Sequence, residues 1–177
     1  MHVGDPVPTV SDIEIVALTA DQWRDLKRLR IAALSQSPDS FSPTAESALA
    51  HDDEYWRRGA QRAADAPNFE MFIVRRNGEG LGLASAHCDD DGVGHIGAMW
   101  VDPVLRGQGI GGRLFDTAVE FLRRRGCARI ELSVTESNAA AIALYQSRGF
   151  RLTGESEPLR PGSPLRNLAM RSVRASP

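Results

Sequence analysis

The 177-residue chain has few cysteines and no long apolar run, and these two features argue against a disulfide-bonded protein and a membrane protein. Cys88 and Cys127 stand far apart in the sequence without a C-x-x-C spacing, which predicts two reduced, partly buried thiols. No apolar stretch approaches the roughly 18 residues of a membrane span, and the first residues lack the basic start and apolar core of a signal peptide. We therefore expect a cytoplasmic protein that does not act at a membrane.

The sequence also lacks the residue spacings of metal ligands and a large net charge. The four histidines form no H-E-x-x-H or similar pattern, so no metal is expected. The formal net charge of −2 provides no global electrostatic case for nucleic-acid binding. Length and composition instead suit one domain over residues 1–177, with residues 1–11 and 174–177 expected to be flexible.

Hydrophobic periodicity predicts a mixed α/β chain in the order β-α-α-β-β-β-α-β-α-β-β. Strands are expected over residues 12–18, 69–76, 80–88, 95–101, 128–134, 150–155 and 166–173. Helices are expected over 19–38, 42–64, 110–126 and 138–149, the second with Ser42 as N-cap and Pro43 at its first position. One β-α-β passage lies between antiparallel strands, which predicts a mixed sheet. The last strand offers an edge through which a homodimer could pair.

The segment R-G-Q-G-I-G-G, Arg106 to Gly112, lies between an apolar strand and a helix. A helix begins with about four backbone N–H groups that lack partners, and its dipole is positive at that end. Glycines at 107, 109, 111 and 112 leave those donors uncovered, which suits a phosphate or pyrophosphate. Arg106 can add positive charge or point to solvent. A tight glycine-rich turn without a ligand is the alternative interpretation.

Two common phosphate loops do not match this segment. A Walker loop requires a Lys-Ser or Lys-Thr pair after the glycines, and its absence, with that of a magnesium ligand, argues against a nucleotide hydrolase. A Rossmann fingerprint requires G-x-G-x-x-G, but the glycines here are misplaced and no matching acidic residue stands about 20 positions on. The pattern R-x-x-G-x-G, filled by Arg106, Gly109 and Gly111, does fit.

Two stretches together resemble the GNAT superfamily of acetyl-CoA-dependent N-acetyltransferases: V-D-P-V-L-R-G-Q-G-I-G-G-R-L-F at 101–115 and S-V-T-E-S-N-A-A-A-I-A-L-Y-Q-S-R-G-F at 133–150. The close match covers residues 95–152, whereas 12–75 agree only in pattern. The resemblance implies a sheet splayed between its fourth and fifth strands, where pantetheine pairs with the backbone of Met99, Trp100 and Val101. It also implies that the pyrophosphate is bound by Arg106, Gly107, Gln108, Gly109, Ile110, Gly111 and Gly112.

Asn138 and Tyr145 lie seven residues apart in the last predicted helix, on nearly the same face. Asparagine is a preferred N-cap, and the resemblance adds a hydrogen bond from Asn138 to pantetheine. Tyr145 could simply pack on the sheet, but it also suits a general acid. The ordinary pKa of a phenol, near 10, exceeds that of a thiol, near 8.5, so Tyr145 stays protonated and can donate to the departing thiolate. Tyr145 is therefore expected to contact the cofactor as well.

The base that takes the proton from the amine is not evident. The strand H-I-G-A-M-W-V lacks the glutamate that many relatives use there. His95 stands near that place with an ordinary pKa of about 6.5, although a histidine at a strand start is also a common surface residue. Glu131, which points opposite to Ile130 and Leu132, is a second candidate. The absence of an evident base favours a proton relay through water over both side chains.

The sequence thus predicts transfer of an acetyl group from acetyl-CoA to a primary amine, with a small molecule favoured over a protein N-terminus or lysine. The acceptor is expected opposite the cofactor, near Phe41, Tyr55, Trp56 and the loop 156–167, although Phe41 and Trp56 are more typical of core residues than of pocket residues. A non-catalytic acyl-CoA-binding sensor module is the rival interpretation. Such a module could dispense with the acid, so the presence of Tyr145 argues against it.

Overall fold

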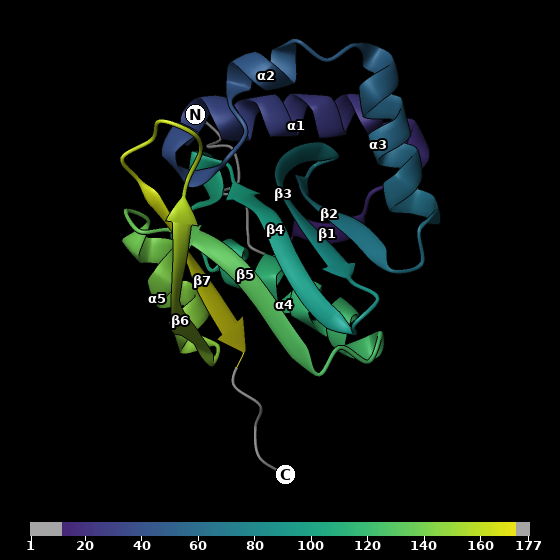
Figure 1. The fold of residues 1–177 in the computed structure, drawn as a ribbon. Coiled ribbons are helices and arrows are strands. Elements are labelled where there is room, and N and C mark those ends of the chain that lie inside the picture. Colours follow the sequence, from purple (N-terminus) through teal and green to yellow (C-terminus); the bar gives the residue numbers. More distant parts are fainter. Residues whose placement is uncertain (1–11, 173–177) are drawn as a thin grey trace, which may run out of the picture.

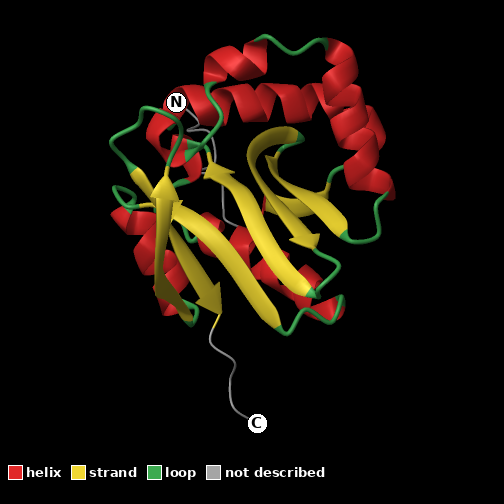
Figure 2. Cartoon of the chain, in the orientation of Figure 1, coloured by secondary structure: helices red, strands yellow, loops and turns green. Residues whose placement is uncertain are grey.

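The computed structural model describes residues 12–172, in which helices cover both faces of a seven-stranded sheet (Figures 1 and 2). The elements are β1 (Ile13–Ala17), α1 (Trp23–Gln36), α2 (Ala45–Leu49), α3 (Asp53–Asp65), β2 (Phe69–Arg76), β3 (Glu79–Cys88), β4 (Val93–Val101), α4 (Ile110–Arg124), β5 (Arg129–Thr135), α5 (Ala139–Ser147), β6 (Phe150–Pro158) and β7 (Arg166–Ser172). This order confirms the predicted mixed α/β chain. The ends expected to be flexible, 1–11 and 174–177, lie outside the described residues.

The second predicted helix is in fact two helices, α2 and α3, and Ser42 is not its N-cap. Thr44 caps α2 and accepts a hydrogen bond from the Ser47 N–H at 3.1 Å. Asp52 caps α3 and accepts from the Tyr55 N–H at 2.9 Å. Short polar side chains satisfy N–H groups that a continuous helix would bond internally, so they favour a new helix start. The residues from 37 to 44 therefore connect α1 to α2 and contain only a short 3₁₀ helix, Pro38–Ser40.

The strands lie in the order β1-β2-β3-β4-β5-β7-β6, and every pair is antiparallel except β4 with β5. β7 pairs with β5 on one side and with β6 on the other, so it lies inside the sheet. The expectation that residues 166–173 form a free edge for a homodimer is therefore wrong. β6 and β7 form a hairpin that inserts its second strand next to β5, which leaves β6 outside.

The fourth and fifth strands pair over only part of their length. The parallel ladder runs from Val93 opposite Arg129 to Ile96 opposite Leu132 and ends there. Next to this point β4 carries a bulge, where two residues, 98 and 99, face one residue of β3. Ala98 has a φ of +52°, a left-handed conformation that costs a non-glycine residue about 1–2 kcal/mol. The predicted splay between these strands is confirmed, and the strained residue lies at its start.

Separate apolar clusters fill the two faces of the sheet, because successive side chains of a strand point to opposite sides. Along β2, Phe72 and Val74 join the cluster on the α4 face, whereas Met71 and Ile73 join the cluster on the α1 and α3 face. In Figure 1 the helices α1, α2 and α3 gather on one side of the sheet, away from α4 and α5. Both clusters anchor the residues that surround the splay.

The two cysteines lie in contact, which the sequence spacing does not indicate. The Sγ atoms of Cys88, at the end of β3, and Cys127, before β5, are 2.7 Å apart. Both are free thiols. Burial raises the pKa of Cys127 to about 12, so this thiol is protonated at neutral pH.

Two kinds of feature are absent from residues 12–172. No helix in this range is long and apolar enough to cross a membrane. The same residues hold no group of three or more His, Cys, Asp or Glu side chains able to bind a metal ion.

The stability of the fold should depend on Phe115, which is fully buried in α4. Its ring centroid lies 4.8 Å from that of Tyr145 and 5.2 Å from that of Phe150. We expect Phe115→Ala to lower the free energy of unfolding by about 3–5 kcal/mol, because the change leaves a cavity where three elements meet. Chemical denaturation measures this loss. The control Leu49→Ala, at a side chain that is 62% exposed, should change it by less than about 0.5 kcal/mol. A loss below about 1 kcal/mol in Phe115→Ala would contradict this account of the core.

Candidate active site

Two cavities lie next to the splay and share part of their walls. The first, here called the loop cavity, has a volume of about 570 Å³ and is lined by the glycine segment, the end of β4 and α5. The second, here called the sheet cavity, has a volume of about 410 Å³ and lies against β5, β7 and the connection after α1. Six residues line both: Ser40, Phe41, Met99, Asn138, Ala141 and Tyr145. A molecule that extends through the loop cavity can therefore meet one in the sheet cavity.

The glycine segment turns sharply before α4. Gly107 and Gly109 have φ values of +73° and +75°, a region that favours glycine, and Gly109 is the N-cap of α4. Within α4 the N–H of Arg113 bonds to the Gly109 carbonyl at 3.1 Å. The helix therefore leaves the N–H groups of residues 110–112 without internal partners at the wall of the loop cavity. The glycine segment thus has the uncovered backbone donors at a helix start that the sequence predicts.

Gly112, but not Gly111, lies in close contact with the end of α5. A Cβ on Gly112 would lie 2.2 Å from Nη2 of Arg148, which forms an ion pair with Asp116 at 2.8 Å. A Cβ on Gly111 would lie 3.9 Å from the Leu144 side chain, an ordinary contact. Gly112 therefore makes room for a guanidinium, a reason for its glycine that the sequence does not show.

All but one of the predicted cofactor-binding residues line the loop cavity. Arg106 lines it with its side chain folded back, so that Nε donates to the Val101 carbonyl at 3.0 Å. Gln108 is the exception, because its side chain donates to the Val104 carbonyl at 3.1 Å and it is absent from the cavity wall. Arg106 is thus attached to the end of β4, where its charge lies beside the glycine segment.

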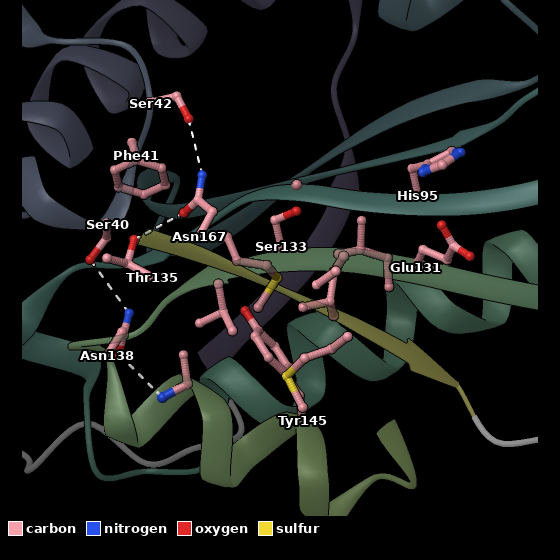
Figure 3. Close-up of a pocket in the computed structure, with 18 of the residues that line it drawn as sticks. Ser40, Phe41, Ser42, His95, Glu131, Ser133, Thr135, Asn138, Tyr145 and Asn167 are labelled. Atoms are coloured by element: carbon pink, nitrogen blue, oxygen red, sulfur yellow. Dashed lines mark hydrogen bonds between the residues drawn. The ribbon is translucent and has the colours of Figure 1, made fainter. Parts of the chain in front are cut away.

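Asn138 caps α5 and also reaches across the boundary of the two cavities. Its Oδ1 accepts a hydrogen bond from the Ala141 N–H at 3.2 Å, which confirms the predicted N-cap. Its Nδ2 donates to Ser40 Oγ at 3.4 Å (Figure 3). The amide therefore ties the start of α5 to the connection after α1.

Tyr145 is buried, with 6% of its surface exposed, and its ring packs against Phe115. Burial raises its pKa to about 12. Its hydroxyl forms no hydrogen bond with any residue in the described part of the chain, and Figure 3 shows it pointing from α5 into the sheet cavity. At neutral pH this side chain presents a protonated phenol at the place where the two cavities meet.

His95 and Glu131 both line the sheet cavity, and each already has a charged partner. Nε2 of His95 lies 2.8 Å from Oδ2 of Asp89, and this hydrogen bond lowers the pKa of Asp89. Oε1 of Glu131 accepts from Nε of Arg171 at 2.8 Å and lies 3.1 Å from Nε of Arg129. In Figure 3 the two side chains lie at the opposite end of the view from Ser40 and Phe41. A partner at Nε2 leaves Nδ1 of the histidine as its hydrogen-bond acceptor.

Polar residues that the sequence analysis did not single out complete the sheet cavity. Asn167 donates to Ser42 Oγ at 3.3 Å and accepts from Thr135 Oγ1 at 3.3 Å (Figure 3). Thr135 shares a face of β5 with Ser133 and Glu131, so the two-residue period of a strand could have indicated it. No comparable signal marks Ser42 or Asn167, because the chain brings them together from positions 125 residues apart.

The predicted acceptor residues are only partly brought together. Phe41 lines both cavities, and residue 167 of the predicted loop lines the sheet cavity. Trp56 is a core residue under α3, with 5% of its surface exposed, in agreement with the core interpretation that the sequence favours. Tyr55 is 43% exposed on α3 and lines neither cavity, because the break before α3 carries its helix away from the splay.

Comparison with known proteins agrees with this geometry. The acetyltransferase (GNAT) family model matches residues 28–150. The chain is 34% identical over 124 residues to a mycothiol acetyltransferase of Beutenbergia cavernae, an alignment that covers 69% of this chain and 39% of that protein. The chain thus spans about two fifths of the length of this curated relative.

Solved structures share the fold at low sequence identity. An acetyltransferase of the GNAT family from Streptococcus pneumoniae has a TM-score of 0.79 and 19% identity, over 92% of this chain and 99% of that one. A protein of Salmonella typhimurium, solved with its cofactor acetyl-CoA, has a TM-score of 0.75 and 19% identity over 93% and 97% of the two chains. Since the family model covers more than half of its residues, the chain belongs to the GNAT acetyltransferase family.

Proposed function

We propose that this chain transfers an acetyl group from acetyl-CoA to the primary amine of a small molecule by direct attack on the thioester. The observation that carries the proposal is the meeting of the loop cavity and the sheet cavity at the buried Tyr145. Family membership, the acetyl-CoA bound to the Salmonella typhimurium neighbour and the mycothiol acetyltransferase relative support the donor and the acceptor class. Two free thiols support a cytoplasmic location, which is also part of the proposal.

Acetyl-CoA would lie in the loop cavity. Its pyrophosphate suits the N–H groups of residues 110–112 and the charge of Arg106, because unbonded donors and the helix dipole both favour an anion. Its pantetheine arm suits the part of β4 that β5 leaves unpaired, at Met99, Trp100 and Val101. The thioester would then lie near Tyr145, within reach of an amine in the sheet cavity.

Tyr145 would stabilise the sulfur as the thioester breaks. The amine nitrogen bonds to the carbonyl carbon, the C–S bond breaks, and the sulfur leaves with the electron pair. A phenol of pKa about 12 is a weaker acid than a thiol of pKa about 8.5, so full proton transfer to the sulfur is uphill by roughly 5 kcal/mol. Tyr145 therefore acts as an acid chiefly by donating a hydrogen bond to the developing thiolate.

His95 is the group in the sheet cavity best arranged to receive the proton of the amine, through water. Asp89 holds its Nε2, which leaves Nδ1 as the acceptor, whereas the carboxylate of Glu131 is already paired with Arg129 and Arg171. Figure 3 places His95 away from Tyr145, so a relay has to connect them.

Blocking the glycine segment should abolish cofactor binding. We expect Gly109→Trp to remove measurable acetyl-CoA affinity in titration calorimetry, because the indole would fill the loop cavity and cover the N–H groups. The matched control is Gly92→Trp, since Gly92 has a φ of +73° and open space around it in the β3–β4 turn. Equal affinity in Gly109→Trp and wild type would show that the segment is only a turn.

Removing the phenolic hydroxyl should slow the chemical step. Tyr145→Phe should lower kcat by roughly 10²-fold with little change in acetyl-CoA affinity, since the ring packing is kept and only the donor is lost. Thiol release from acetyl-CoA measures the rate. The raised pKa also predicts that wild type keeps this donor as the pH rises past 10, where an ordinary tyrosine ionises. An unchanged kcat in the variant would remove Tyr145 from the mechanism.

Replacing His95 should weaken proton removal. His95→Gln should lower kcat/KM at pH 7 by roughly 10²-fold, the size typical of a lost general base. The control is His87→Gln. His87 lies on the neighbouring strand with its ring centroid 6.0 Å from that of His95, but it does not line the sheet cavity. A rate close to that of wild type in His95→Gln would mean that water carries the proton away without this residue.

A further inference from the structure

Arg30 lies in the middle of α1 and lines the sheet cavity. Its guanidinium carbon lies 5.4 Å from the ring centroid of Phe41, so the charged group stacks on the aromatic ring at the wall of both cavities. This contact places the guanidinium at the end of the sheet cavity that holds Ser40 and Ser42.

The charge of Arg30 has no counter-ion among residues 12–172. Its Nη1 is buried without a hydrogen-bond partner, and burial lowers the pKa of this guanidinium. The one ionisable side chain that raises the pKa of Arg30 is Tyr55, and a phenol is ordinarily neutral at pH 7. By contrast, Arg28 on the same helix pairs with Asp25, and Arg160 nearby donates to the Pro38 carbonyl at 2.8 Å. The Arg30 side chain is half-buried, with one buried N–H group unbonded and no counter-ion, which is unfavourable, so its place at a cavity wall favours an anionic ligand beside its accessible atoms.

The hydroxyl groups beside Arg30 also present donors. Ser40 Oγ accepts from Asn138 Nδ2, and Ser42 Oγ accepts from Asn167 Nδ2. Since each hydroxyl already accepts an amide N–H, its own hydrogen is left to donate. A guanidinium with two hydroxyl donors is suited to bind carboxylate or phosphate oxygens.

A third cavity next to Arg30 is also lined by positively charged side chains. Arg30 also lines this cavity of about 460 Å³ between α1, α3 and β2, together with Arg58 and Arg62 and no acidic residue. The opposite end of the sheet cavity instead holds the Glu131 carboxylate and His95 (Figure 3). Two carboxylates, Glu131 and Glu155, and a second guanidinium, Arg171, also line the sheet cavity, but Glu131 is paired with Arg171 whereas Arg30 has no acidic partner among residues 12–172.

We propose that the acceptor carries an anionic group, a carboxylate or a phosphate, in addition to its amine, and that Arg30 with Ser40 and Ser42 binds this group. This inference rests on the proposed function, since it names the class of amine that the sheet cavity takes. The anion would lie against Phe41 and Arg30, with the amine directed toward the place where the two cavities meet. Arg30 thereby selects among amines without taking part in the acetyl transfer itself.

The test uses pairs of acceptors that differ only in charge. A series of ω-amino carboxylates of increasing length is compared with the matching primary amides, and thiol release from acetyl-CoA provides kcat/KM. At the best length, wild type should prefer the carboxylate by about 10- to 100-fold, the range expected for hydrogen bonds to a charged group. Amides that serve as well as carboxylates would overturn the proposal. An aminoalkyl phosphonate that surpasses the carboxylate would assign the site to phosphate-bearing amines.

Substitution of Arg30 then decides whether this residue causes the preference. Arg30→Gln should reduce the ratio of carboxylate to amide to about one, through a loss of kcat/KM for the carboxylate that exceeds any change for the amide. Arg30→Lys keeps the charge without the planar fork, so it should keep part of the preference. A full preference in Arg30→Gln would overturn the assignment. Thermal unfolding checks each variant, and Arg30→Lys provides the comparison if Arg30→Gln fails to fold.

The matched control is Arg24→Gln. Arg24 also lies on α1 and stacks on an aromatic ring, with its guanidinium carbon 4.3 Å from the Trp23 centroid, but it lines neither the loop cavity nor the sheet cavity. The carboxylate preference should survive this change.

Failure of the proposed function can be told apart from failure of this inference. If wild type acetylates no amine, the proposed function falls, and calorimetric titration of the same carboxylates still tests the Arg30 site. Binding to wild type that is lost in Arg30→Gln would support the site, whereas equal binding to both, or to neither, would overturn it.

Discussion

The end of the β4–β5 ladder at Ile96 is the constraint on which the rest of the site depends. Beyond this point β5 no longer pairs with β4, and the bulge at residues 98 and 99 turns the strand away. Backbone N–H and C=O groups that lose a strand partner need another one, so this part of β4 is prepared for an extended ligand. The loop cavity and the sheet cavity share Met99, which lies at the start of this gap. Pairing of the two strands along their full length would leave no room for either molecule.

Burial has opposite effects on the two side chains that matter most next to the splay. For Tyr145, burial against Phe115 keeps the phenol protonated and directs its hydroxyl to the meeting point of the cavities. For Arg30, burial disfavours a charge that the described residues do not compensate. The first side chain is stable without a ligand because it is neutral, whereas the second gains most when an anion arrives. This difference underlies the two roles that we propose, Tyr145 toward the donor and Arg30 toward the acceptor.

Local sequence patterns predicted the parts of the site that are formed by residues close together in the sequence. The glycine segment, the Asn138 cap and the side of β5 on which Glu131 lies follow from spacing over a few residues, and all three appear in the structure. The break between α2 and α3 was not predicted, because Thr44 and Asp52 are capping residues that an apolar periodicity does not register. The pairing of Asn167 with Ser42 and the contact of Cys88 with Cys127 were equally hidden.

The sequence by itself determined the order of the elements, the cradle of backbone donors at the start of α4 and the family to which the chain belongs. Only the tertiary structure decided that β7 lies inside the sheet, that Arg148 needs Gly112, and that Arg30 faces a cavity without a counter-ion. The physical reason is the range of the interactions. Helix starts and strand faces depend on neighbours a few residues away, whereas strand order, burial and charge compensation depend on residues that the folded chain brings from distant positions.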